Sequence, residues 1–385
     1  MVVDYNRFLS STGRQLAESA IRRMGTVVAG ATDLVSFAPG YPAPELFPWD
    51  ELREISAVLL TRADPDALQY GPTRGYAPLL ETIAGLSAER GIIAAPDQLM
   101  ITSGSQQGID LIARVMVSPG DVVLVELPTF TGGIAAFRNA QAHLVGVPQD
   151  AQGIDLDALE AAWQRERSAG RTIKLLYVIP NFQNPTGALL ALSRRRQLME
   201  WAGRRDVLIV EDDPYGSLYF EDAATASKTL APGFRVGWLV AAPALVQRFE
   251  TAKQSIDLTS GALDQLVVHE AVKRGVVQAL APKLRALYAR KRDVMEQAIR
   301  AHIGGRLTWS PPKGGFFLWA TLPTGSSDHA LLERALAHGL VFVVGSAFYV
   351  DGTGHEKIRL SFSAPSIDRI EEGVKRLAKA LNAST

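Results

Sequence analysis

Several features are missing from this sequence of 385 residues. It has no cysteine, so disulfide bonds and thiolate catalysis are excluded. Forty Lys and Arg balance forty Asp and Glu, so no overall charge attracts nucleic acid or an anionic membrane surface. The apolar runs, such as 122–125 and 175–179, are far shorter than a membrane span, and the N-terminus lacks the apolar core of a secretory signal. We therefore expect a cytoplasmic protein that binds neither nucleic acid nor a membrane.

The apolar runs that are present predict buried strands. DVVLVELP at 121–128, IKLLYVIP at 173–180 and VLIVEDDP at 207–214 each contain a continuous apolar run, as in strands covered on both faces. Between them, 156–166 and 193–204 vary with roughly helical period. This alternation predicts an α/β fold with a mainly parallel sheet, in which ligands bind at the C-terminal ends of the strands.

The pattern changes after about residue 280. A long helical segment at 284–303 is followed by FFLWATLP at 316–323 and IRLSFS at 358–363. We interpret this region as a smaller α+β lobe. The predicted organisation is an N-terminal arm and part of the small domain at 1–47, a large cofactor-binding domain at 48–281, and a small C-terminal domain at 282–385.

The most informative motif is SKTLAPGFRVGW at 227–238. Lys228 precedes a Gly-containing loop, and Arg235 follows it at the start of an apolar strand. A lysine that forms an imine with a cofactor must be a free amine, so its usual pKa of about 10.4 has to fall through burial or a nearby charge. Arg235 could supply that charge and clamp a phosphate. A lone lysine is more often a solvated surface amine, so other motifs must support this hypothesis.

Three further motifs lie where predicted strands end or a helix begins. NPTG at 184–187 is typical of an ordinary turn, but the Asn184 amide could donate to a phenolate oxygen of a cofactor ring. EDDPY at 211–215 could cap a turn, or Asp212 could pair with a pyridinium nitrogen and Tyr215 with the phenolate. SGSQQG at 103–108 is compatible with a helix N-cap or with a phosphate site at a helix N-terminus.

Taken in their order along the chain, the four motifs resemble those of fold-type I pyridoxal phosphate enzymes of the aspartate aminotransferase superfamily. SFAPGYP at 36–42, LQYGP at 68–72 and IRLSFS at 358–363 are similar to signatures of the 2-aminoadipate, branched-chain and aromatic aminotransferases, a group that includes kynurenine aminotransferases. The resemblance covers most of the chain. It implies a large domain with a mainly parallel, mixed sheet of the seven-stranded type between helices, and a smaller α+β domain.

The resemblance also implies roles for individual residues. Lys228 would carry pyridoxal 5'-phosphate as a Schiff base, with Asp212 and Tyr215 as further catalytic residues. The implied contacts with the cofactor ring come from Asp212, Asn184, Tyr215 and Phe130, the last of which would stack on the ring. The implied phosphate contacts come from Ser105, Gln106, Thr225, Ser227, Arg235 and, across a homodimer interface, Tyr70. No metal is implied.

Arg359 matches the arginine that binds the substrate α-carboxylate, a task that suits a planar guanidinium because it can bind both carboxylate oxygens. Asn184, Gly40 and Tyr41 would also contact the substrate, and Arg22 could bind a distal carboxylate or simply lie on a solvated helix face. The resemblance implies a ping-pong aminotransferase that moves an amino group from an L-amino acid to a 2-oxo acid, with Lys228 as proton shuttle.

Two alternatives remain. A lyase or decarboxylase could use the same cofactor residues, although Arg359 favours transamination by retaining the carboxylate. A remote alternative is the ligand-sensing, aminotransferase-like domain of a transcription regulator. Such regulators place a DNA-binding domain before this pattern, which begins here within the first 40 residues.

One interval departs from the family. Lys228 follows Tyr215 by only 13 positions, which leaves no room for the additional strand that usually leads into the lysine. Omitting a central strand would leave buried backbone groups unpaired. We therefore expect that residues between about Phe220 and Ala226 are absent from the given sequence.

Overall fold

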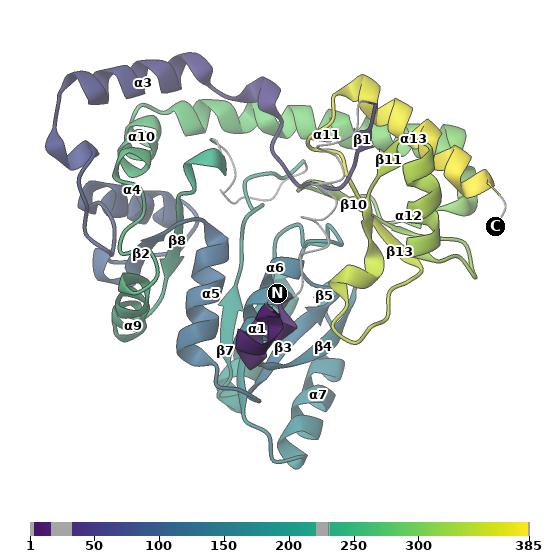
Figure 1. Ribbon diagram of the computed structural model, residues 1–385, viewed down its shortest axis with the longest axis horizontal. Coiled ribbons are helices and arrows are strands. Elements are labelled where there is room, and N and C mark those ends of the chain that lie inside the picture. The colour runs from purple at the N-terminus through teal and green to yellow at the C-terminus, as the bar shows by residue number, and fades with distance from the viewer. Residues whose placement is uncertain (1–3, 17–32, 221–229, 231, 384–385) are drawn as a thin grey trace.

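The computed structural model describes residues 4–16, 33–220, 230 and 232–383. Figure 1 shows an α/β region in the lower centre, a group of helices with two strands on the left, and a C-terminal lobe on the right. The long helix α11 (Val276–His302) runs between the last two.

The central sheet has the strand order β5-β4-β3-β6-β7. β4, β3, β6 and β7 run parallel to one another, and the short β5 at the edge is antiparallel to β4. The strands are β3 (Val122–Leu127), β4 (His143–Asp150), β5 (Gly153–Ile154), β6 (Ile173–Val178) and β7 (Leu208–Glu211). The three apolar runs chosen from the sequence thus form β3, β6 and β7.

Helices cover both faces of this sheet, which explains the continuous apolar runs. Val122 and Leu124 of β3 pack towards α7 (Leu156–Ser168) and α8 (Leu192–Arg205). Val123 and Val125 pack on the other face, in the cluster that includes residues of α5 (Ser105–Met116) and α6 (Thr131–Asn139). Because successive strand residues point to opposite faces, both sets are removed from water.

A second sheet pairs β2 (Leu99–Thr102) with β8 (Gly237–Val240) in antiparallel register. One face packs on α4 (Ala77–Ala88) and the other on α9 (Pro243–Gln254). Nearby, α10 (Ala262–Lys273) packs on α3 (Trp49–Thr61).

The number of strands agrees with the predicted seven-stranded type, but their pairing differs. Among the described residues, the seven strands form a five-stranded and a two-stranded sheet, and no ladder joins β7 to β8. The chain between these two strands includes 221–229 and 231, which lie outside the described residues, as does most of the interval where we expect missing residues. That expectation therefore stays a prediction.

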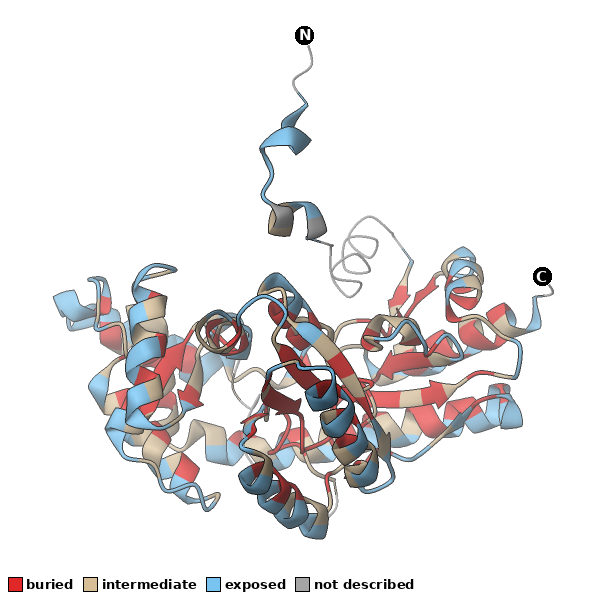
Figure 2. Ribbon diagram, turned by 90° about the horizontal axis from the view of Figure 1, so that it is seen from below, coloured by how far each residue is buried: buried red, intermediate tan, exposed pale blue. Residues whose placement is uncertain are grey.

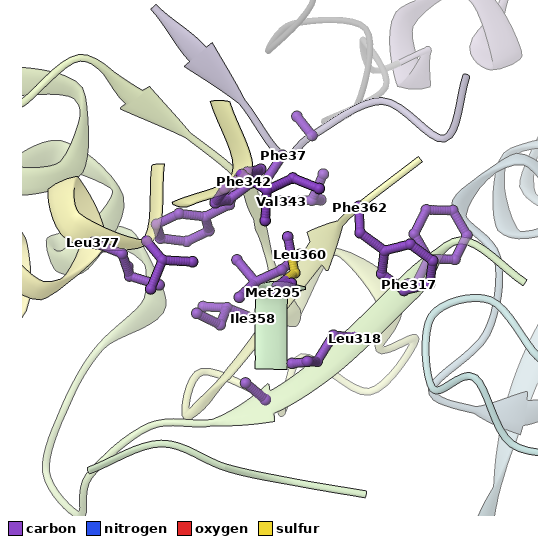
Figure 3. Close-up of a cluster of buried hydrophobic side chains, with 14 of the residues drawn as sticks. Phe37, Met295, Phe317, Leu318, Phe342, Val343, Ile358, Leu360, Phe362 and Leu377 are labelled. Carbon is purple, nitrogen blue, oxygen red and sulfur yellow. The ribbon is translucent and has the colours of Figure 1, made fainter. Parts of the chain in front are cut away.

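The C-terminal lobe has an antiparallel sheet of order β12-β13-β10-β9. Its strands are β9 (Thr308–Trp309), β10 (Phe317–Thr321), β12 (Val343–Val344) and β13 (Lys357–Ser361). α11, α12 (Asp328–Ala337) and α13 (Ile367–Asn382) enclose a single large apolar cluster with the sheet. Figure 3 shows part of this cluster, in which Met295 of α11 lies among side chains such as Ile358 and Leu360 of β13.

The N-terminal residues contribute to the same lobe. β1 (Val35–Ser36) pairs in parallel with β11 (Leu340–Val341), whereas the preceding helix α1 (Ser11–Gln15) stands away from the body of the molecule (Figure 2). The short 3₁₀ helices are η1 (Tyr5–Phe8), η2 (Pro44–Leu46), η3 (Pro65–Ala67), η4 (Pro96–Gln98), η5 (Pro232–Phe234), η6 (Gly304–Arg306) and η7 (Gly345–Phe348).

The predicted border at 281/282 falls inside α11, which is continuous around Pro282. The three-part division of the chain stays a prediction. In the part of the chain that the structure describes, no helix is long and apolar enough to cross a membrane.

Candidate active site

The polar motifs lie at the C-terminal ends of strands, where an α/β sheet binds its ligands. Ser103 follows β2 and leads into α5, and Asp212 follows β7. Asn184 lies in the loop after β6. The ends of β2, β6 and β7 supply side chains to this region, and β13 of the C-terminal lobe adds Arg359, which contacts Asn184.

The structure distinguishes Asp212 from the acidic residues on either side of it. Asp212 is only 8% exposed, and its Oδ2 accepts a hydrogen bond of 2.8 Å from the Tyr177 hydroxyl. Asp213 instead forms an ion pair with Arg90 and accepts from the Gly216 backbone N–H. Glu211 is the last residue of β7 and is exposed. Asp212 is thus the carboxylate held inside the site.

Tyr215 and Asn184 form a buried pair. The Asn184 side chain hydrogen-bonds to Tyr215, whose ring packs edge-on against Phe316 and Phe317 at centroid distances of 5.5 and 5.7 Å. Burial raises the pKa of Tyr215, and the nearby positive charge of Arg359 opposes that effect. Protein side chains, not water, therefore hold Asn184 and Tyr215 in place.

Arg359 lies beside this pair and is 1% exposed. Its Nη1 donates to Asn184 Oδ1 at 2.8 Å, and its Nη2 donates to the Ala38 carbonyl at 2.5 Å. The guanidinium also lies 4.0 Å from the Phe317 ring centroid and 5.0 Å from that of Phe348. Its buried Nε has no hydrogen-bond partner among the described residues.

The burial of Arg359 is costly because a charge has left water. It lowers the pKa of the guanidinium to about 10, so the group remains protonated at neutral pH. A buried cation with one N–H unsatisfied favours an anion beside it, and a carboxylate can accept two bonds from a guanidinium edge. Arg359 can therefore bind a carboxylate.

Arg235 occupies a different setting, on the exposed side of the loop after β2. Its Nη2 donates to the Ser103 carbonyl at 3.2 Å. Gly104 has φ +82°, and a Cβ on it would lie only 2.4 Å from Arg235 Nη2, so the guanidinium packs directly on bare backbone. The N-terminal N–H groups of α5 start at this place, and they and Arg235 could together bind a phosphate.

Gln106 and Phe130 meet at the N-terminus of α6. The Gln106 amide donates to the Gly132 carbonyl at 3.0 Å, and a Cβ on Gly132 would contact both Gln106 and the Phe130 ring. A Cβ on the next residue, Gly133, would lie 2.9 Å from the Tyr177 ring. The first turn of α6 therefore connects the Asp212 region with the N-terminal turn of α5, which carries Ser105 and Gln106.

A family model of aminotransferase class I and II matches residues 49–377. This chain belongs to that family. It is 37% identical over 397 positions to aromatic-amino-acid aminotransferase 1 of Thermococcus litoralis, covering 98% of this chain and 95% of the relative. It is 39% identical over 368 positions to 2-aminoadipate transaminase of Thermus thermophilus, covering 90% of both chains.

The fold of this aminotransferase is also that of solved relatives. The crystal structure of kynurenine aminotransferase from Pyrococcus horikoshii, in complex with PMP, KYN as substrates and KYA as products, superposes with a TM-score of 0.92 at 36% identity and covers 98% of each chain. The family resemblance, the fold class, the aminotransferase activity and the pyridoxal phosphate cofactor expected from the sequence are confirmed.

The remaining predicted site residues divide into three groups. Gly40 lies within the region, because a Cβ on it would be 2.6 Å from Phe317 Cζ. Ser105 and the side chains of Tyr41 and Tyr70 are exposed, the last two by 57% and 77%. Outside the described residues lie Arg22, Thr225, Ser227 and Lys228.

Sequence reasoning missed several residues of this aminotransferase site. It did not single out Tyr177, which binds Asp212, or Phe317 and Phe348, which flank Arg359. It also missed Glu126, which accepts from the Ile179 N–H and the Gln183 amide. Glu126 and Tyr177 could have been noticed as polar groups inside apolar strand runs, whereas the two phenylalanines look like any core residue.

Proposed function

We propose that this aminotransferase transfers an amino group from an L-amino acid to a 2-oxo acid with pyridoxal 5'-phosphate, by a ping-pong mechanism. The observation that carries the proposal is Arg359, a buried cation that has one N–H unpaired and is held by Asn184 and Ala38. Such a group matches the α-carboxylate that all 2-amino and 2-oxo acids share.

The described residues fit the cofactor. Asp212, buried and hydrogen-bonded, suits a protonated ring nitrogen, and Asn184 with Tyr215 suits a phenolate oxygen. Arg235 on the bare backbone of Gly104, with the N-terminus of α5, suits a phosphate. Phe130 at the start of α6 suits a ring face. The solved Pyrococcus relative contains PMP, an aminated form of the same cofactor.

Each residue then has a distinct task. Arg359 binds and orients the α-carboxylate, which keeps the carboxylate in place while the Cα–H bond breaks. The aromatic rings of Phe317 and Phe348 keep water from Arg359. Lys228 would hold the cofactor and, as a free amine, would accept the proton released from Cα. When bound, pyridoxal phosphate supplies an electron-withdrawing ring that stabilises the charge left at Cα.

The names of the relatives and the walls of the region support the substrate class that we propose. The matched relatives bear the names aromatic-amino-acid aminotransferase, 2-aminoadipate transaminase and kynurenine aminotransferase. The aromatic rings around Arg359 suit aromatic or aliphatic donors, and we assign contacts with the side chain to Gly40 and Tyr41. Arg22 is the group that would accept a distal carboxylate such as that of 2-aminoadipate.

The proposal includes a homodimer in the cytoplasm. Exposed apolar side chains gather near Tyr70, since the Thr259 hydroxyl donates to the Pro72 carbonyl and so holds two loops together. These loops expose Leu68, Tyr70, Ile256 and Leu258. A second copy that covers them would place each Tyr70 at its partner's phosphate site.

The test is a panel of aromatic, aliphatic and acidic amino acids with 2-oxoglutarate or pyruvate as acceptor. We expect equimolar formation of a new 2-oxo acid and a new amino acid, together with a change in cofactor absorbance when the donor alone is added. Release of carbon dioxide or ammonia without a new amino acid would establish the lyase or decarboxylase alternative instead.

A further inference from the structure

Tyr177 is a polar residue in the interior of the protein that the mechanism above does not use. It lies near the end of β6, and its backbone is in register with Val125 of β3 and Val210 of β7. Its side chain is 0% exposed, and its hydroxyl donates to Asp212 Oδ2 at 2.8 Å. A phenol at the centre of three parallel strands thus points its only proton at the carboxylate assigned to the cofactor ring.

β6 holds Asp212 twice. The Asp212 backbone N–H donates to the Val178 carbonyl at 2.9 Å, and the side chain of the preceding residue, Tyr177, binds the Asp212 carboxylate. The first contact fixes where the Asp212 backbone leaves β7, and the second fixes the rotation of the carboxylate. Backbone and side chain of Asp212 are therefore positioned by consecutive residues of one strand.

Tyr177 has no room to turn away from Asp212. Its ring packs edge-on against Phe137 of α6, with centroids 5.6 Å apart. A Cβ on Gly133 would lie 2.9 Å from Tyr177 Cε1 and 3.2 Å from its hydroxyl, so the backbone of α6 lies directly over the ring. The hydroxyl is consequently fixed by packing before any ligand arrives.

Tyr177 also stays a donor at all working pH values. Burial raises its pKa well above the usual value, and the nearby negative charge of Asp212 acts in the same direction. A hydrogen bond donated to a carboxylate stabilises the charged form of that carboxylate. A charged Asp212 is the form that can pair with a protonated ring nitrogen.

We propose that Tyr177 is a positioning residue that holds Asp212 in the orientation and charge state needed to pair with the ring nitrogen of the cofactor. This inference rests on the proposed function, because it assigns a partner to Asp212. Tyr177 itself touches neither substrate nor cofactor in this assignment. Its effect passes through Asp212 alone, and that feature makes the proposal testable.

The experiment is a double-mutant cycle with Tyr177→Phe, which removes only the hydroxyl, and Asp212→Ala. The readouts are the dissociation constant of pyridoxal phosphate for the apoprotein and the absorbance maximum of the bound cofactor. We expect Tyr177→Phe alone to weaken cofactor binding about tenfold, as for loss of a hydrogen bond to a charged group, and to shift the maximum in the direction seen for Asp212→Ala. In the Asp212→Ala background, the same change should alter the dissociation constant less than about twofold.

A second pair of variants moves Tyr177 without removing its hydroxyl. Gly133→Ala places a methyl group against the ring, whereas Gly203→Ala, in helix α8, meets no atom within 4 Å. Gly133→Ala should shift the absorbance maximum in the same direction as Tyr177→Phe, and Gly203→Ala should leave it unchanged.

The outcomes separate the two proposals. If Asp212→Ala changes neither cofactor binding nor transamination, the assignment of Asp212 in the proposed function is wrong. If Asp212→Ala acts as expected but the effect of Tyr177→Phe persists at full size without Asp212, Tyr177 has a structural role only and the inference is overturned. A Tyr177→Phe protein with unchanged affinity and absorbance overturns it as well.

Discussion

Arg359 and Arg235 are assigned to the two anionic groups of the reaction, and their surroundings differ in almost every respect. Arg359 is inside the protein, with two hydrogen bonds and two aromatic rings around it. Arg235 is exposed, has φ +52° and donates to the Ser103 carbonyl at 3.2 Å. The carboxylate end of the site is thus organised before a ligand binds, whereas Arg235 at the phosphate end is exposed to solvent.

The difference indicates how each end obtains its affinity. A buried, prearranged cation loses little entropy when it binds and acts in a medium of low dielectric constant, so its contribution is large. An exposed arginine is screened by water and must become ordered on binding, so its contribution is smaller. Substitutions at the Arg359 end should therefore cost more than equivalent substitutions at the Arg235 end.

Arg359→Lys should have the largest effect. Lysine presents one compact charge and cannot bind Asn184, the Ala38 carbonyl and a carboxylate with the same planar geometry. We expect kcat/KM for amino-acid donors to fall about 1,000-fold, or about 4 kcal/mol, with cofactor affinity nearly unchanged. The exposed Arg248→Lys is the matched control. A loss below tenfold would remove the distinction between the two ends.

Glu126→Gln tests whether the buried carboxyl group of Glu126, which binds Gln183 next to Asn184, keeps its proton in the folded protein. The readout is the pH dependence of stability. Burial raises the pKa of Glu126 to about 8, from a usual value of 4.5. Between these two values the folded protein keeps a proton that the unfolded chain has lost, so stability should fall as pH rises, by about 1.4 kcal/mol per pH unit, and become level above pH 8. Glutamine retains an acceptor oxygen but does not titrate, so this contribution to the pH dependence of stability disappears.

The measurement is the free energy of unfolding in urea at pH 5.5, 6.5 and 7.5. Glu126→Gln should show a slope less negative than that of the wild type by about 1.4 kcal/mol per unit, and the exposed Glu89→Gln should follow the wild type. Parallel slopes for all three proteins would mean that Glu126 is ionised in the folded state.

Arg235→Lys should produce a smaller change at the open end. We expect the dissociation constant of pyridoxal phosphate to rise about tenfold, or about 1.4 kcal/mol, because the fork that binds two phosphate oxygens is lost while a charge remains. The melting temperature of the apoprotein should stay within a few degrees, since the side chain is exposed. A tenfold loss of stability rather than affinity would contradict the comparison.

Tyr70→Phe should have the smallest effect. One exposed hydroxyl is removed, so we expect about a threefold loss of cofactor affinity, or about 0.6 kcal/mol, and only at concentrations where the dimer forms. The test combines cofactor titration with light scattering over a range of protein concentrations. Tyr5→Phe, also exposed, is the control. An effect of equal size in the monomer would place Tyr70 at its own subunit's site.

The sequence was sufficient for three strands of the central sheet and for the region of the site. The runs that became β3 and β6 were recognisable because burial on both faces leaves no alternation to interpret, whereas the run that became β7, in which Leu208 is 40% exposed, was recognisable only by its apolar composition. Asp212, Asn184 and Tyr215 followed because parallel strands bring their C-terminal ends to one edge. The resemblance then added Arg359, which lies 175 positions from Asn184 yet binds it.

Other features needed the three-dimensional arrangement. The contacts of Tyr177 with Asp212 and of Phe317 with Arg359 join different strands, and no spacing in the sequence indicates them. Among the described residues the seven strands form two sheets, and part of the chain between β7 and β8 lies outside the described residues. The alignment with the Thermococcus relative has 397 positions but contains only 98% of the 385 residues of this chain, so about 20 positions of the relative have no counterpart here.

Helix α11 has a mechanical consequence for the whole molecule. Its 27 residues form a lever about 40 Å long, which runs from the helices around α10 into the core behind Arg359. Pro282, near its first turns, has no N–H to complete the helical ladder, so the helix is weakest at that point. A rotation of a few degrees at this point would move the distant end of α11, which packs in the core of the C-terminal lobe, farther than the residues beside the proline.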